Sequence, residues 1–153
     1  MNKLINERNE VMENFLGGMK KNYLKNILGT KLKSCCNKCI IRDKNKYSTG
    51  YYRDGFCSTG QSDTGTHIVC AIVDNDFLEF TKSKGNDLIT PHFPNFPGLV
   101  EGDKWCLCIY RWIEAYKANK APKIIAESTN EIASSYIDKR ILLKFSIDYK
   151  KKI

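Results

Sequence analysis

The run His67-Ile68-Val69-Cys70-Ala71-Ile72-Val73 limits the fold of this chain more than any other segment. It has the length of a strand, it is rich in β-branched residues, and no polar residue interrupts it after His67. A continuous apolar run of this kind predicts a strand that is buried on both faces. We therefore expect residues 67–73 to lie inside a small sheet.

Helical periodicity appears on both sides of this predicted strand. Apolar residues recur at spacings of three and four, which predicts helices at residues 3–28, 77–84, 103–119 and 130–144. The pair Gly17-Gly18 interrupts the first of them, so two shorter helices are an alternative there. The expected N-terminal caps of the last three are Asp74 or Asp76, then Asp103, then Thr129.

The remaining segments read as strands and loops. Short strands are expected at Ile40-Ile41 and at residues 123–126, and long ordered loops at residues 30–50, 50–65 and 86–102. Helices and strands are mixed, which is typical of the α+β class. We expect a single compact domain with a small sheet, three or more helices and long ordered loops, plus an N-terminal helical extension.

Composition excludes several classes of protein. A chain of 153 residues is of the size of one domain. No run approaches the ~20 apolar residues that span a bilayer, so membrane insertion is not expected. The first 14 residues are polar and unlike a secretory signal, which favours the cytoplasm, where disulfides are rare. Seven cysteines are an odd number, which also argues against a fully paired secreted framework.

The net charge of +8 is concentrated at the two ends of the chain. Residues 1–50 hold 11 Lys and Arg against four acidic residues, whereas residues 51–149 hold 11 against 13. Lys150, Lys151 and Lys152 add three more charges. Basic ends can contact nucleic acid or a partner without sequence specificity, but they also serve solubility alone.

The stretch Trp105-Cys106-Leu107-Cys108, followed by Arg111-Trp112, holds both tryptophans and two of the seven cysteines. A metal, a redox pair, a binding pocket or a tight core would each explain this density. Zinc is a candidate cofactor, with a loosely spaced set of possible ligands in Cys57, His67, Cys70, Cys106 and Cys108. Cys36 and Cys39 have the spacing of a zinc knuckle, but they need a second pair of ligands from elsewhere.

Two other interpretations of these cysteines stay open. On a helix, Cys106 and Cys108 would point roughly 200° apart, which makes a chelate of the two awkward. At a helix start, the dipole would instead stabilise a reactive thiolate. Alternatively, the cysteines are small apolar residues that pack beside Trp105 and Trp112.

Polar side chains gather in the loops that flank the predicted strand. Convergent polar groups on loops are the usual composition of a ligand pocket, and the candidates for ligand binding are Tyr52, Arg53, Asp54, Thr59, Asp63, Asn86, Asp87, Thr90 and Arg111. The candidates for catalysis are His67 as general acid or base and Cys57 and Cys106 as thiols. The alternative is that the Asp and Asn side chains only hold the loop backbone.

Longer motifs support a family resemblance. The chain contains Asn26-Ile27-Leu28-Gly29, Gly50-Tyr51-Tyr52-Arg53-Asp54-Gly55-Phe56-Cys57-Ser58-Thr59-Gly60, Gly65-Thr66-His67-Ile68-Val69-Cys70-Ala71, Lys84-Gly85-Asn86-Asp87-Leu88, Phe96-Pro97-Gly98-Leu99 and Gly102-Asp103-Lys104-Trp105-Cys106-Leu107-Cys108. It resembles the small proteins of Domain of Unknown Function 2237, found mainly in bacteria, for which no activity or cofactor is established. The resemblance implies a family domain at residues 26–149. Residues 1–25 would be a basic helical extension, and residues 150–153 a basic tail.

Three functional hypotheses follow. The first is a cytosolic domain that binds a small molecule or peptide in a polar, cysteine-lined pocket. That pocket would be built from residues 50–70, 86–98 and the segment that begins at Trp105. The second is a thiol-based or metal-dependent enzyme that uses Cys57, His67 and Cys106. The third is an interaction protein that contacts nucleic acid through residues 1–49 and 150–153.

Overall fold

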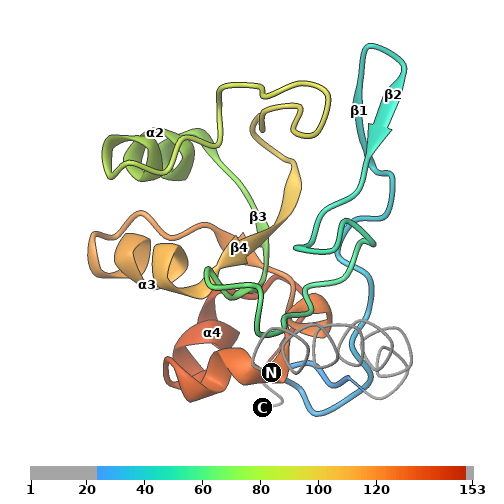
Figure 1. Ribbon diagram of the computed structural model, residues 1–153. Coiled ribbons are helices and arrows are strands. Elements are labelled where there is room, and N and C mark those ends of the chain that lie inside the picture. Colours follow the sequence, from blue (N-terminus) through green and yellow to red (C-terminus); the bar gives the residue numbers. More distant parts are fainter. Residues whose placement is uncertain (1–23, 151–153) are drawn as a thin grey trace, which may run out of the picture.

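The computed structural model describes residues 24–150. Within them the elements are β1 (Ile40–Arg42), β2 (Asn45–Tyr47), β3 (His67–Ile72), α2 (Asn75–Ser83), β4 (Lys104–Cys108), α3 (Ile109–Lys117), β5 (Lys123–Ile124), η1 (Ala126–Ser128), η2 (Glu131–Ser135) and α4 (Lys139–Phe145) (Figure 1). The two η elements are short 3-10 helices. The described part of the chain thus combines three α-helices with two small antiparallel sheets, which confirms the α+β class.

The predicted strand at residues 67–73 is confirmed as β3, the central strand of the larger sheet. This sheet has the order β4-β3-β5, and both of its pairings are antiparallel. Ile68, Val69, Cys70 and Ala71 are fully buried, as expected for a strand without alternating polar residues. The smaller sheet is the β1–β2 hairpin, which projects from the body of the molecule (Figure 1).

The segment after Asp103 differs from its prediction. We expected one helix over residues 103–119, but Lys104–Cys108 is the strand β4, and α3 begins only at Ile109. Pairing with β3 provides backbone hydrogen bonds that local helical periodicity does not reveal. Asp103 consequently does not cap α3: its carboxylate accepts a hydrogen bond from the Val100 amide and forms an ion pair with Arg42.

The extended backbone of β4 changes the geometry of its cysteines. Residues two apart on a strand point to the same face, so Cys106 and Cys108 do not diverge as they would on a helix. Cys106 lies directly opposite Cys70 in the register, and Cys108 lies opposite His67. The interpretation of Cys106 as a thiolate at a helix start is therefore wrong for this backbone. Cys108 immediately precedes α3.

Helix α2 confirms the prediction at residues 77–84, with Asp74 as the cap that accepts from the Phe77 amide. The predicted helix at 130–144 is divided into η2 and α4, capped by Asn130 and Asp138 instead of Thr129. Thr129 is fully buried, and its hydroxyl accepts a hydrogen bond from the Cys70 amide. The predicted short strands near residues 40 and 123 are present as β1 and β5.

The core lies between the larger sheet and the helices. Trp112 is fully buried in it, and its Nε1 donates to the Pro122 carbonyl at 3.2 Å. The Phe145 ring meets the Trp112 ring edge-on at 5.3 Å, which fixes α4 against α3. One of the two tryptophans of the conspicuous sequence stretch is thus a core residue.

Two predictions concern segments at the ends of the chain. The N-terminal helical extension falls almost wholly on residues 1–23, and most of the basic tail falls on residues 151–153. Both lie outside the described residues. Across residues 24–150, no helix has the length and apolar character to cross a membrane.

Candidate functional site

Six cysteines are paired in three disulfides: Cys35–Cys70, Cys36–Cys39 and Cys57–Cys106. Within residues 24–150, Cys108 is the free thiol, and it is partly buried. Cys36 and Cys39, the predicted zinc knuckle, bond to each other next to the β1–β2 hairpin. The disulfide of Cys35 attaches its loop to β3, and the disulfide of Cys57 attaches a second loop to β4. These two strands are neighbours in the larger sheet.

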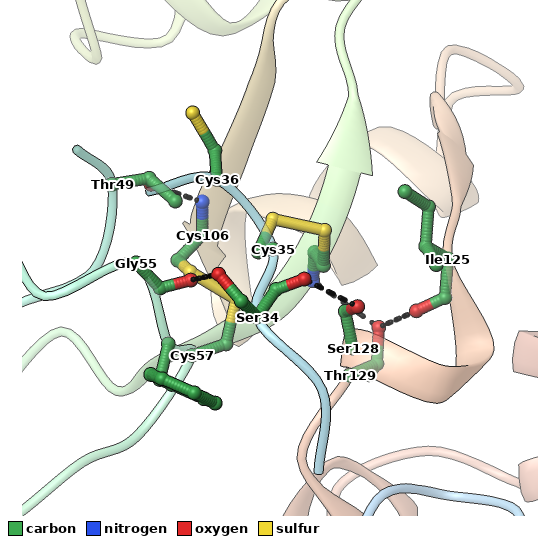
Figure 2. Close-up of a disulfide and its surroundings, with 12 residues drawn as sticks. Ser34, Cys35, Cys36, Thr49, Gly55, Cys57, Cys106, Ile125, Ser128 and Thr129 are labelled. Atoms are coloured by element: carbon green, nitrogen blue, oxygen red, sulfur yellow. Dashed lines mark hydrogen bonds between the residues drawn. A yellow bond between two sulfur atoms is a disulfide. The ribbon is translucent and has the colours of Figure 1, made fainter. Parts of the chain in front are cut away.

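Cys35, Cys57, Cys70 and Cys106 form a buried cluster of their own, separate from the main core. Figure 2 shows the disulfide of Cys35 close to the bond between Cys57 and Cys106, whereas the sulfur of Cys36 points away from them. All four residues of this cysteine cluster are 5% exposed or less. The four cysteines are buried, as expected of small apolar residues. They pack with one another as disulfides, however, and not beside Trp105 and Trp112, which belong to the main core.

Buried hydroxyl groups frame the cysteine cluster (Figure 2). The Thr49 hydroxyl accepts from the Cys106 amide at 2.7 Å, and the Thr129 hydroxyl donates to the Ile125 carbonyl at 2.8 Å. The Ser128 hydroxyl donates to the Ser34 carbonyl, which links the loop that precedes Cys35 to η1. Loops without regular structure are thereby fixed around the four cysteines.

A cavity of about 330 Å³ opens beside this cluster. Its walls come from the loop after Thr49, the start of β3, the loop after Asn86 and the start of β4, and they consist of Gly50, Tyr51, Arg53, His67, Asp87, Leu88, Phe96, Trp105 and Cys106. A volume of this size lies at the lower end of small-molecule sites. We call it the Arg53 pocket.

Arg53 contributes a cationic group to this pocket. Its guanidinium lies 4.9 Å from the centroid of the Trp105 ring, and its Nη1 donates to the Gly50 carbonyl at 2.6 Å. Partial burial of the charged group lowers the pKa of Arg53, yet its charge persists at any physiological pH. No carboxylate of residues 24–150 lies within ion-pair distance of it.

The turn that carries Arg53 contains two residues with positive φ angles. Arg53 has a φ of 56°, an uncommon conformation for a residue with a side chain. Gly50 has a φ of 98°, and a Cβ atom there would lie 2.4 Å from the Phe56 carbonyl oxygen. The turn that presents Arg53 therefore requires glycine at position 50.

His67 is the second titratable group in the pocket, and Asp63 holds its ring. The Asp63 carboxylate is buried, and one of its oxygens lies 2.6 Å from Nδ1 of His67. Its other oxygen accepts from the Thr59 hydroxyl and the His67 amide, both at 2.9 Å. Gly65 leaves room for the ring, since a Cβ atom there would lie 2.5 Å from its Cε1. In the neutral imidazole, Nδ1 donates to Asp63 and Nε2 is left as the acceptor.

Asp87 lies at the rim of the pocket and is engaged within its own loop. Its carboxylate accepts from the Ile89 amide and from the amide and hydroxyl of Thr90. These bonds, chiefly those from Thr90, lower the pKa of Asp87 to about 2. Asp87 and Thr90 thus perform the loop-holding role that was the alternative to ligand binding.

The other predicted ligand-binding residues lie outside the pocket lining. Tyr52 meets the Tyr51 ring edge-on, and the Asp54 carboxylate accepts from the Phe56 amide. Asn86 donates to the Thr81 hydroxyl at the end of α2. Arg111 contacts the Lys84 carbonyl and Glu114 on the surface.

Of the predicted residues, the structure brings Arg53, His67, Asp87 and Cys106 together, with Asp63 and Thr59 behind the His67 ring. The sequence interpretation missed the apolar lining, namely Tyr51, Leu88, Phe96 and Trp105. Phe96 meets the Trp105 ring edge-on at 5.4 Å. Trp105 was expected on a helix, and only its place on β4 directs it toward Arg53.

A second hollow, of about 510 Å³, lies between α2 and α3, lined by residues such as Phe80, Tyr110 and Glu114. It is larger but more open, and it contains none of the predicted site residues. The Arg53 pocket combines a cation, an oriented imidazole and aromatic walls, so we regard it as the candidate site.

The sequence profile of Domain of Unknown Function 2237, described as an uncharacterized protein conserved in bacteria, matches residues 25–146. The chain belongs to this family. A search of curated proteins found no match. The matched range includes every residue of the Arg53 pocket and of the cysteine cluster.

Proposed function

We propose that this domain binds a small organic anion in the Arg53 pocket. The observation that carries the proposal is the Arg53 guanidinium, which is partly desolvated over Trp105 without a carboxylate partner among residues 24–150. A guanidinium in this setting pairs favourably with a carboxylate or phosphate, because it presents several donors in a planar arrangement. The intramolecular bond to Gly50 occupies only one of them.

The rest of the pocket suits a ligand with an apolar part. Tyr51, Leu88, Phe96 and Trp105 offer apolar and aromatic surface around the cation. His67 offers Nε2, the acceptor of the neutral imidazole, to a hydroxyl or N–H group elsewhere on the ligand, since Asp63 occupies Nδ1. A carboxylate joined to a ring or a short apolar chain therefore matches the lining better than inorganic phosphate does.

Binding of 3-phenylpropionate and of its uncharged amide, followed by NMR of the ¹⁵N-labelled protein, tests the proposal. We expect the acid to shift the signals of Arg53 and Trp105, and the amide to bind at least about tenfold more weakly, as the loss of a charge-assisted contact implies. Arg53→Gln should abolish the difference. Arg140→Gln, at an exposed site on α4 whose ion pair within residues 24–150 is with Asp138, is the matched control. Equal binding of acid and amide would contradict the proposal.

A second candidate function is catalysis with His67 as general acid or base. The 2.6 Å contact between Nδ1 and the buried Asp63 favours it, because a carboxylate that orients an imidazole is the usual support of a catalytic histidine. The thiol-based version needs Cys57 or Cys106 in reduced form. Labelling with iodoacetamide before and after reduction tests it: no labelling of either cysteine after reduction would contradict a role as nucleophile.

The remaining hypotheses stay predictions. Contact with nucleic acid through residues 1–49 and 150–153 concerns a region of which residues 1–23 and 151–153 lie outside the described part. Removal of these ends should abolish binding to duplex DNA, and the binding of the full chain should fall steeply with salt. The cytoplasmic location is likewise a prediction.

A further inference from the structure

We propose that the reduced form of this protein binds one zinc ion through Cys35, Cys57, Cys70 and Cys106. The site goes beyond the proposed anion binding and uses different side chains, apart from Cys106 at the edge of the Arg53 pocket. It also differs from the zinc ligands that the sequence indicated, since it includes Cys35 and omits His67 and Cys108.

The positions of the sulfur atoms carry this inference. The Sγ atoms of Cys35, Cys57 and Cys70 all lie within 4.8 Å of one another, and all three residues are buried. Tetrahedral zinc with Zn–S bonds of ~2.3 Å requires sulfurs about 3.8 Å apart. Cys35 and Cys70 are bonded directly to each other in the oxidised protein, so reduction must let this pair move apart. The Cys57 sulfur already lies within reach of both.

Cys106 supplies the fourth ligand. It is bonded to Cys57, and it lies directly opposite Cys70 in the register of β3 and β4. Side chains of directly opposed residues in an antiparallel pair lie on the same face, with Cβ atoms about 5 Å apart. Four cysteines from four separate parts of the chain therefore meet in one buried cluster. Four thiolates are the number that closes the coordination shell of a structural zinc site.

Two other side chains near the cluster, those of Cys36 and His67, have partners of their own and are not part of the proposed zinc site. Cys36 packs in the main core and bonds to Cys39. His67 is held by Asp63 through Nδ1. Ser58, which follows Cys57, has a buried hydroxyl without a hydrogen-bond partner among residues 24–150. The residue next to Cys57 in the sequence thus carries a hydroxyl donor that no described residue uses.

Reduction of the two disulfides precedes zinc binding. Two molecules of a dithiol reductant each transfer two electrons and two protons to one disulfide, so that Cys35–Cys70 and Cys57–Cys106 become four thiols and the reductant becomes a disulfide. Zn²⁺ then replaces the four thiol protons, which pass to solvent, because thiolates are the form that coordinates the metal. Two molecules of a disulfide oxidant reverse the sequence: each accepts two electrons from two thiolates and two protons from solvent and becomes two thiols, while Zn²⁺ is released and both protein disulfides form again.

Titration of the full chain with Co²⁺ under anaerobic conditions tests the site. A phosphine reductant opens each disulfide by taking one oxygen from water and leaving two thiols, and it avoids competition from added thiols. We expect about one Co²⁺ per chain, with the absorption bands of tetrahedral thiolate coordination, and displacement of Co²⁺ by Zn²⁺. The unreduced protein should give no such bands.

Variants identify the ligands. Cys35→Ala, Cys57→Ala, Cys70→Ala and Cys106→Ala should each remove the tetrathiolate bands, whereas Cys108→Ala and the double variant Cys36→Ala/Cys39→Ala should keep them. If an alanine variant does not fold, Cys106→His keeps four ligands and should shift the bands toward those of a three-sulfur, one-nitrogen site. Absence of the bands in the reduced wild-type protein would overturn the proposal. The proposal would also be overturned if the bands were lost in the Cys36/Cys39 double variant and kept in the four single variants.

The titration is separable from the test of anion binding. Binding of 3-phenylpropionate is measured on the unreduced protein, in which both disulfides are intact. Failure of one experiment therefore leaves the outcome of the other unaffected.

Discussion

Nδ1 of His67 lies 2.6 Å from a carboxylate oxygen of Asp63, and the side chain of Asp63 is completely buried while that of His67 remains 37% exposed. The carboxylate thus sits behind the imidazole and fixes its orientation, and the exposed part of the ring reaches the Arg53 pocket. Asp63 also accepts from the Thr59 hydroxyl and the His67 amide. One buried side chain therefore positions a loop, the start of β3 and a candidate functional group.

Replacement of Asp63 by alanine should destabilise the protein by about 2–4 kcal/mol, because it leaves several partly buried donors without their acceptor. Urea denaturation of the oxidised protein measures the change in the free energy of unfolding. Glu79→Ala, at an exposed position of α2, serves as the control and should change it by less than about 0.5 kcal/mol. Equal effects of the two substitutions would show that Asp63 does not hold the loop.

Thr49 anchors the strand that carries Cys106. Thr49→Val preserves the shape of a fully buried side chain but removes the acceptor of the Cys106 amide. The unpaired amide should cost about 1–3 kcal/mol of stability. Thr49→Ser keeps the hydroxyl and should recover most of the hydrogen-bond contribution. If the serine variant is no more stable than the valine variant in thermal unfolding, the hydrogen bond is not the stabilising contact.

A disulfide that closes a long loop should stabilise the oxidised protein more than one that closes a short loop. Cys57 and Cys106 are 49 residues apart, so loss of their cross-link through a double alanine substitution should cost about 4 kcal/mol by loop-closure entropy. Cys36 and Cys39 are three residues apart, and their loss should cost about 2 kcal/mol on the same basis. Chemical denaturation of both double variants checks the order. A larger loss for the Cys36/Cys39 variant would contradict it.

The stability of the loop around Asp87 should depend on pH in the acidic range. Folding lowers the pKa of Asp87 to about 2, below the ordinary value of 3.8, so the contribution of its carboxylate is complete above pH 4 and is lost as the pH falls toward 2. NMR titration of the Asp87 side chain and the Thr90 amide should give one midpoint near 2. Thr90→Val removes the hydroxyl donor and should raise that midpoint toward 4. An unchanged midpoint in this variant would exclude the Thr90 hydroxyl as the main cause.

The sequence by itself determined the family, the α+β class and the position of the buried strand β3, because these depend on local composition and motif order. It also identified Arg53, His67, Asp87 and Cys106 as candidates. Helical periodicity was misleading at residues 104–108, where hydrogen bonds to β3 impose a strand that no local pattern encodes. Trp105 was missed as a wall of the Arg53 pocket for the same reason.

Only the tertiary structure decided which cysteines meet. Cys35, Cys57, Cys70 and Cys106 are separated by up to 71 positions in the chain, and no spacing rule connects them. The register of β3 against β4 sets Cys70 beside Cys106. Hydrogen bonds from Ser128 to the Ser34 carbonyl and from Asn130 to the Cys57 carbonyl hold the loops that bring the other two cysteines to this cluster. Contacts of this kind arise from packing between distant segments, whereas the sequence pattern records only the preferences of each segment taken alone.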